Sequence, residues 1–130
     1  MSEREIKESQ LLNIQLFTLV FSLISILISM IVTYNQKLDV ENKEVIFKAE
    51  KARKISLFNR ILIVIIAITF LYVNYKQYIL DKDSNNINNL KNDKLQVAAS
   101  IFTIIASLIT DYVVYSSTTE TVSDIENPLV

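Results

Sequence analysis

Long apolar runs alternate with polar stretches along the chain, and three of the runs have the length of a membrane-spanning helix. They cover Leu11–Tyr34, Ile55–Leu80 and Leu95–Tyr115. Each is close to the ~20 residues that an α-helix needs to cross a hydrocarbon core of about 30 Å. The pattern therefore predicts an all-α membrane protein with three transmembrane helices, in a single domain over residues 1–130.

Capping and turn residues predict where the first helix lies. Ser2 and Glu5 have the spacing of a capping box, in which the two side chains satisfy free amide groups at the start of a helix. We therefore expect the first helix over about residues 2–34. A turn rich in polar residues is expected over residues 35–42.

The second helix is predicted from the absence of residues that break helices. The chain contains no Gly and a single Pro, and nothing between Val40 and Leu80 would stop a helix. We expect a second helix over about residues 40–80, which would be ~60 Å long, about twice the hydrocarbon thickness. Residues 40–56 would then project beyond the bilayer as a stalk.

The third helix is expected to follow a connection over residues 81–90, where Asn and Asp take the turn positions usually given to Gly. Asn92 or Asp93 is the predicted N-cap, and the helix is expected over about residues 93–117. The remaining residues, 118–130, are predicted to form a mobile acidic tail.

Polar side chains recur at every third or fourth position of the first helix, which aligns them along one face. This first polar stripe consists of Gln15, Thr18, Ser22, Ser25, Ser29 and Thr33. A second polar stripe lies on the third helix and consists of Gln96, Ser100, Thr103, Ser107 and Thr110, with Ala99 and Ala106 on its flank. The second helix has no comparable stripe, and we expect it to have little polar surface to bury.

Two roles fit the polar stripes. Serine and threonine can bond to carbonyl groups of their own helix, and small residues let helices pack closely in lipid. Alternatively, several copies of the chain form a homo-oligomeric helical bundle, in which one stripe from each copy lines a water-filled pore. Both roles can coexist, one stripe packing and the other lining. For the lining we favour the first stripe, because it is longer and has fewer alanines beside it.

Asp111 is an acidic residue inside the apolar run of the third helix, about 7 Å from the bilayer centre. In a homo-oligomer it would form a ring of carboxylates near one mouth of a pore, which favours cations. The alternative is an interfacial acid that Tyr112, Tyr115 or a lysine of a neighbouring helix holds in place.

A basic cluster lies at the start of the second apolar run and consists of Lys48, Lys51, Arg53, Lys54 and Arg60. Arg60 is expected to extend along the helix toward the lipid headgroups. The cluster either sets the membrane topology or binds anionic lipids, at about 1 kcal/mol per residue. A nucleotide or nucleic-acid effector is a further ligand class for the basic stalk, without a motif behind it.

The composition excludes most enzyme chemistry. The chain has no Gly, and therefore no phosphate-binding loop or nucleophile elbow. It has no His and no Cys, and so lacks the usual zinc ligands and catalytic triads. We expect no enzymatic activity, no metal and no cofactor.

These features together predict a small homo-oligomeric membrane pore or ion channel, gated through the stalk. By size and topology alone, the chain is similar to phage holins and to membrane effectors of bacterial antiviral systems, which permeabilise the inner membrane. The alternative is a non-conducting membrane partner, such as an immunity, anchoring or regulatory subunit. The positive charges, densest in the first loop, predict a multi-pass protein of the cell membrane with its N-terminus outside and its C-terminus inside.

Overall fold

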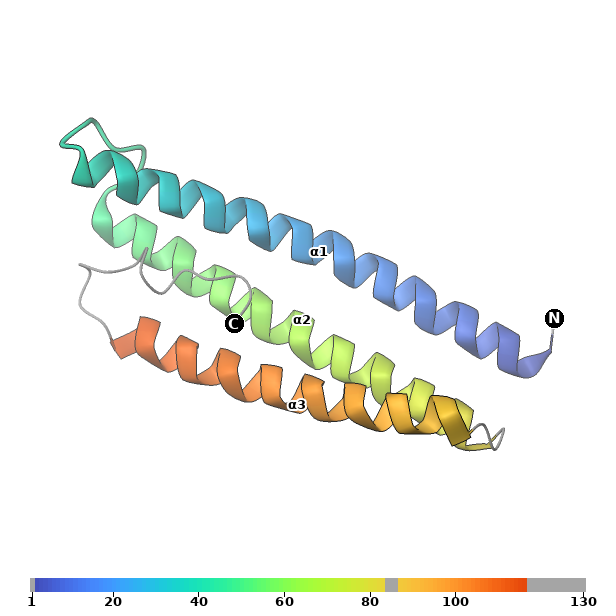
Figure 1. The fold of residues 1–130 in the computed structure, drawn as a ribbon. Helices are drawn as coiled ribbons and strands as arrows, with labels where there is room; N and C mark the ends of the chain where they lie inside the picture. The colour runs from blue at the N-terminus through green and yellow to red at the C-terminus, as the bar shows by residue number, and fades with distance from the viewer. Residues whose placement is uncertain (1, 84–86, 117–130) are drawn as a thin grey trace.

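Three long α-helices lie side by side in the computed structural model, which describes residues 2–83 and 87–116 (Figure 1). They are α1 (Glu3–Val40), α2 (Ala49–Asp83) and α3 (Ile87–Ser116). α2 lies in the middle and contacts both neighbours, whereas no Cα atom of α1 comes within 8 Å of one in α3 in the described part of the chain. The all-helical architecture is therefore confirmed, as an open row rather than a closed bundle.

The start of α1 has the Ser2 N-cap of the predicted capping box. The Ser2 Oγ atom accepts a hydrogen bond from the Glu5 backbone N–H at 3.2 Å and donates one to the Glu5 carboxylate at 3.2 Å. The helix then continues to Val40, beyond the predicted end at residue 34. Asn35 and the residues after it are helical because no residue there removes a backbone donor or demands another conformation.

The end of α1 corrects the prediction of a helix that begins at residue 40. Asn42 adopts a left-handed backbone conformation, with φ of 57°. The Lys43 N–H bonds to the Leu38 carbonyl at 2.9 Å and the Asn42 N–H bonds to the Asp39 carbonyl at 3.1 Å. These two bonds form a Schellman motif, which ends a helix and usually places Gly at the left-handed position. Asn is the next best residue there, so the chain turns without any glycine.

Residues 41–48 form a non-helical loop, and the predicted stalk is therefore wrong over this stretch. The Asn35 side chain holds the loop against α1: its Nδ2 donates to the Phe47 carbonyl at 3.0 Å and its Oδ1 accepts from the Phe47 N–H at 2.8 Å. The first turns of α2 are packed as well, since Ala52 and Ser56 are buried. The predicted stalk is thus partly loop and partly packed helix.

The second connection is shorter than predicted. α2 continues to Asp83 and α3 already begins at Ile87, so Asp93 lies within α3 rather than at its N-cap. The acidic tail predicted over residues 118–130 lies outside the described residues.

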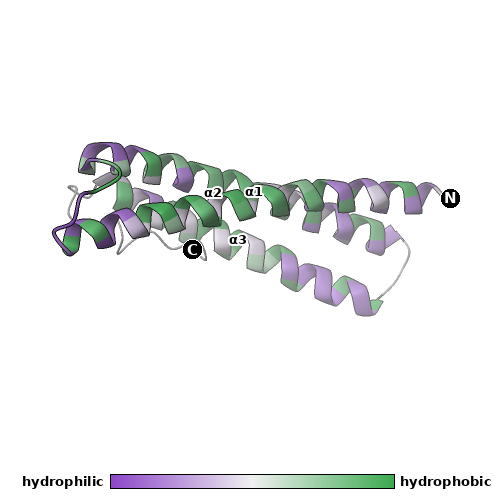
Figure 2. Ribbon diagram, turned by 90° about the horizontal axis from the view of Figure 1, so that it is seen from above, coloured by the Kyte–Doolittle hydropathy of each residue, from purple (hydrophilic) through white to green (hydrophobic). Residues whose placement is uncertain are grey.

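The three helices are each long and apolar enough to cross a membrane, and they fit a multi-pass membrane protein. They contain 38, 35 and 30 residues, which correspond to about 57, 52 and 45 Å, more than a hydrocarbon core of about 30 Å. Figure 2 shows the hydrophobic residues in the middle of the row and the hydrophilic residues toward its ends. The excess length is therefore shared by all three helices rather than confined to α2.

Buried positions repeat at intervals of seven residues, the spacing of left-handed coiled-coil packing. On α1 they include Leu11, Thr18, Ser25 and Val32. On α3 they are Asp93, Ser100, Ser107 and Val114. α2 carries two such rows: one contains Ala52, Asn59 and Val73, and the other contains Arg60, Ala67 and Asp81.

The outer surface is apolar, while polar residues are buried. Phe17 and Phe102 are each 70% exposed, whereas Ser56, Asn59, Arg60 and Ser107 are fully buried. In water this distribution would be unfavourable, because it exposes large hydrophobic side chains and buries polar ones. It suits a chain whose solvent is lipid, in which hydrogen bonds and small residues hold helices together.

Candidate functional site

A polar bridge joins α1 and α2 at the depth of the apolar runs. The Ser25 hydroxyl donates to Asn59 Oδ1 at 2.7 Å, and Asn59 Nδ2 donates to the Ser29 hydroxyl at 2.8 Å. All three residues are buried. Ser25 lies near the middle of the Leu11–Tyr34 run, so Asn59 and its neighbour Arg60 lie at membrane depth if α1 spans the bilayer.

The residues of the first polar stripe differ in how far their side chains are buried. Thr18, Ser25 and Ser29 are buried, Gln15 and Ser22 are half-buried, and Thr33 is exposed. The Thr18 hydroxyl donates to the Ile14 carbonyl at 2.7 Å, and the Ser22 hydroxyl to the Thr18 carbonyl at 3.0 Å. In the single chain, this stripe chiefly packs α1 against α2.

The second polar stripe is divided in the same way. Ser100 and Ser107 are buried, and the Ser100 hydroxyl accepts a bond from Asn74 Nδ2 of α2 at 2.7 Å. Gln96 and Thr103 are exposed, and Thr110 is half-buried. The hydroxyls of the two threonines donate to the backbone carbonyls four residues earlier, at 2.9 and 3.0 Å.

α2 provides polar partners to both neighbours, which corrects the expectation that it has little polar surface to bury. Its buried or half-buried polar residues include Ser56, Asn59, Arg60, Asn74 and Asp81. The signal that could have revealed them is spacing: Arg60, Asn74 and Asp81 lie at multiples of seven residues. They lie toward the ends of the apolar run, where a polar residue is readily assigned to the headgroup region.

Arg60 is fully buried, which corrects the prediction that it extends toward the headgroups. Asp111 of α3 lies within electrostatic range of its guanidinium group. Asp111 itself is half-buried, and its Oδ1 atom and the Ser107 hydroxyl have no hydrogen-bond partner among the described residues. An arginine at this depth is costly unless it is partnered, so ionisable residues of this kind mark functional sites in membrane proteins.

The other members of the predicted basic cluster lie at the loop end of the row. Lys48, Lys51 and Lys54 are exposed. Arg53 is half-buried, and its guanidinium donates to the Tyr115 carbonyl at the end of α3 at 2.7 Å. The four residues therefore form a basic surface that is separate from Arg60.

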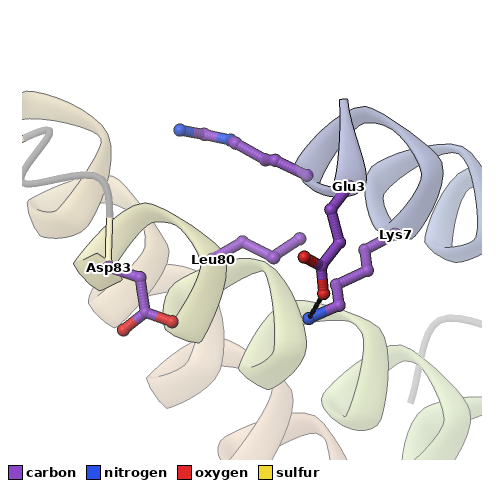
Figure 3. A pocket seen from close by; sticks show the side chains of 5 residues that line it. Glu3, Lys7, Leu80 and Asp83 are labelled. Carbon is purple, nitrogen blue, oxygen red and sulfur yellow. Dashed lines mark ion pairs between the residues drawn. The ribbon is translucent and has the colours of Figure 1, made fainter. Parts of the chain in front are cut away.

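The opposite end of the row carries a charged cluster that the sequence analysis did not identify. Arg4 of α1 bonds to the Asp81 carboxylate of α2 at 2.6 Å, and Asp93 of α3 forms a hydrogen bond with Asp81. Beside them, a shallow pocket of about 280 Å³ is lined by Glu3, Arg4, Lys7, Leu80 and Asp83. Figure 3 shows the Leu80 side chain of α2 pointing toward Glu3 of α1, whereas the Asp83 carboxyl group points away from it; Glu3 and Lys7 form an ion pair of 3.4 Å.

The described residues contain no group of three or more His, Cys, Asp or Glu side chains that could hold a metal ion. Their buried polar side chains instead form the Ser25–Asn59–Ser29 bridge with Arg60 beside it, the Asn74–Ser100 contact, and the charged cluster around Asp81. The chain matches no protein-family model, no curated protein and no solved structure.

Proposed function

We propose that this chain is the subunit of a homo-oligomeric membrane pore, and that the uncovered polar edge of α3 lies along its water path. This edge consists of Gln96, Thr103 and Thr110, which recur every seventh residue. The observation that carries the proposal is their position: Gln96 and Thr103 are exposed and Thr110 is half-buried, whereas Ser100 and Ser107 on the same helix are buried.

The dimensions of the edge suit a water path. From Gln96 to Thr110 it extends over about 21 Å of α3, roughly two thirds of a hydrocarbon core. The threonine hydroxyls donate to their own helix, which leaves their oxygen atoms able to accept hydrogen bonds from water. Because α1 and α3 flank α2 in an open row, one chain does not enclose a channel, and several copies are needed.

The first polar stripe is less suited to line the path than its length and few neighbouring alanines predict. Ser25 and Ser29 hold the Asn59 amide between them. To turn them toward water, α1 would have to separate from α2 and break both bonds. The edge of α3 faces outward without any such rearrangement.

Single-cysteine variants test this proposal, because the chain has no cysteine of its own. Thr103→Cys, Ser25→Cys and Phe102→Cys are each reconstituted into liposomes and treated with a charged, membrane-impermeant thiol reagent. We expect wild-type liposomes to conduct ions, and the reagent to reduce the flux of Thr103→Cys. The flux of Phe102→Cys, the neighbouring lipid-facing control, should not change.

Two other outcomes of this experiment would change the proposal. A response of Ser25→Cys instead of Thr103→Cys would assign the lining to the first stripe. Absence of flux together with a cross-linked size of one chain would overturn the pore. It would favour the non-conducting subunit, which the Ser25–Asn59–Ser29 bridge supports because that bridge fixes the packing of α1 and α2 without a second copy.

A further inference from the structure

All three helices meet at one buried pair of carboxyl groups, at the end of the row that carries the N-terminus. Asp81 of α2 is 2% exposed and Asp93 of α3 is 8% exposed. Asp81 Oδ1 bonds to the Arg4 guanidinium of α1 at 2.6 Å, and its Oδ2 accepts a bond from Gln77 at 3.4 Å. Asp93 forms its hydrogen bond with the Asp81 carboxyl group.

Two carboxyl groups can form a hydrogen bond only when one of them carries a proton, since an ionised carboxylate has no donor. Arg4 neutralises one negative charge, that of Asp81, and leaves Asp93 as the protonated partner. Asp93 Oδ2 is buried and has no hydrogen-bond partner among the described residues, so nothing there stabilises a second negative charge. One proton, on Asp93, and one cation, Arg4, are therefore sufficient to stabilise this pair of carboxyl groups.

Each of the three helices contributes a buried or half-buried charged residue to this pair and its surroundings. α1 contributes Arg4, α2 contributes Asp81, and α3 contributes Asp93 itself. Glu8 of α1, one turn after Arg4, is half-buried, and the other charged side chains near this end are exposed: Glu3, Glu5, Lys7, Lys76, Lys82, Asp83, Lys91 and Lys94. Asp93 precedes the apolar run Leu95–Tyr115, and burial, followed by the hydrogen bond and the charge of Asp81, raises the pKa of Asp93 to about 6.

We propose that Asp81 and Asp93 form a proton-binding site that holds the ends of α2 and α3 together while one proton is shared, and lets them separate when Asp93 ionises. Ionisation places two carboxylates in contact beside a single arginine, in a site with little access to water. Among the described residues no Cα atom of α1 lies within 8 Å of one in α3, so α2 is the helix against which the start of α3 packs. The site acts on helix packing, whether or not the chain conducts ions.

The direction of the pH dependence follows from the raised pKa. The folded, closed state binds the proton more tightly than the open state, in which Asp93 returns toward its ordinary value. The advantage of the closed state is therefore complete below the ordinary pKa of 3.8, decreases as the pH rises above that value, and is lost as the pH passes through about 6.

The test measures the distance between the two helix ends in the full-length protein in lipid nanodiscs. Spin labels are attached to Lys82→Cys and Asn92→Cys, both at exposed positions, and a second pair at Lys54→Cys and Tyr112→Cys reports on the other end of α2 and α3. We expect one short distance at about pH 4 and a growing longer population toward about pH 7.5, for the first pair only. Infrared spectroscopy follows the C=O band of the protonated carboxyl group over the same range.

Matched variants separate this site from a general effect of pH. Asp93→Asn keeps a donor toward Asp81 but cannot ionise, so its distance should stay short at every pH and the titrating C=O band should disappear. Asp83→Asn removes an exposed acid and should leave the midpoint unchanged. The proposal is overturned if the wild-type distance does not change with pH, or if Asp93→Asn retains the wild-type transition. If Asp93→Asn fails to insert, a wild-type C=O band that does not titrate near pH 6 overturns it independently.

Discussion

Asn59→Ala should weaken the association of α1 and α2 more than any other single amide truncation between these helices. The substitution removes the two hydrogen bonds that Asn59 makes with Ser25 and Ser29. Interhelical hydrogen bonds in membranes contribute about 0.6 kcal/mol each, and the space left by a fully buried amide adds a packing loss of similar size. The expected decrease in the free energy of unfolding is therefore about 1–2 kcal/mol.

Unfolding by SDS in mixed micelles, followed by circular dichroism, measures this decrease. Asn13→Ala is the matched control, because Asn13 is exposed on α1; its effect should stay within about 0.5 kcal/mol. In a chain that already carries Ser25→Ala and Ser29→Ala, the same Asn59→Ala change should cost about 1 kcal/mol less. A loss no larger than that of Asn13→Ala, or one that the serine substitutions leave unchanged, would refute the bridge as the source of stability.

Two further substitutions test other parts of the fold. Asn35→Ala removes both bonds to the Phe47 backbone; amide hydrogen exchange at Phe47 should accelerate by about fivefold, since the bond to its N–H contributes about 1 kcal/mol, and unchanged exchange would contradict the assigned contact. Asn74→Ala removes the 2.7 Å bond to Ser100 and should lower the free energy of unfolding by about 0.6 kcal/mol in the same SDS titration, an effect that Ser100→Ala should reproduce and that should not add when the two are combined.

The sequence by itself determined the number and type of the elements. Three apolar runs without glycine, and with the single proline near the C-terminus, leave the α-helix as the structure that satisfies its own backbone in lipid. The capping box at Ser2 is equally local, because the donor and acceptor are three residues apart. The position at which α1 ends was not predicted, and the reason is also local. Asn42 has a left-handed backbone conformation, for which Gly is a strong sequence signal and Asn a weaker one.

Only the tertiary structure decided which polar residues face one another. The seven-residue spacing on α2 is visible in the sequence, but whether Arg60 extends to the headgroups or lies buried depends on where α1 and α3 are placed around it. The bonds of Asn59 to Ser25 and of Asp81 to Arg4 join residues 34 and 77 positions apart. Such pairings depend on the antiparallel register of neighbouring helices, which no local pattern of residues encodes.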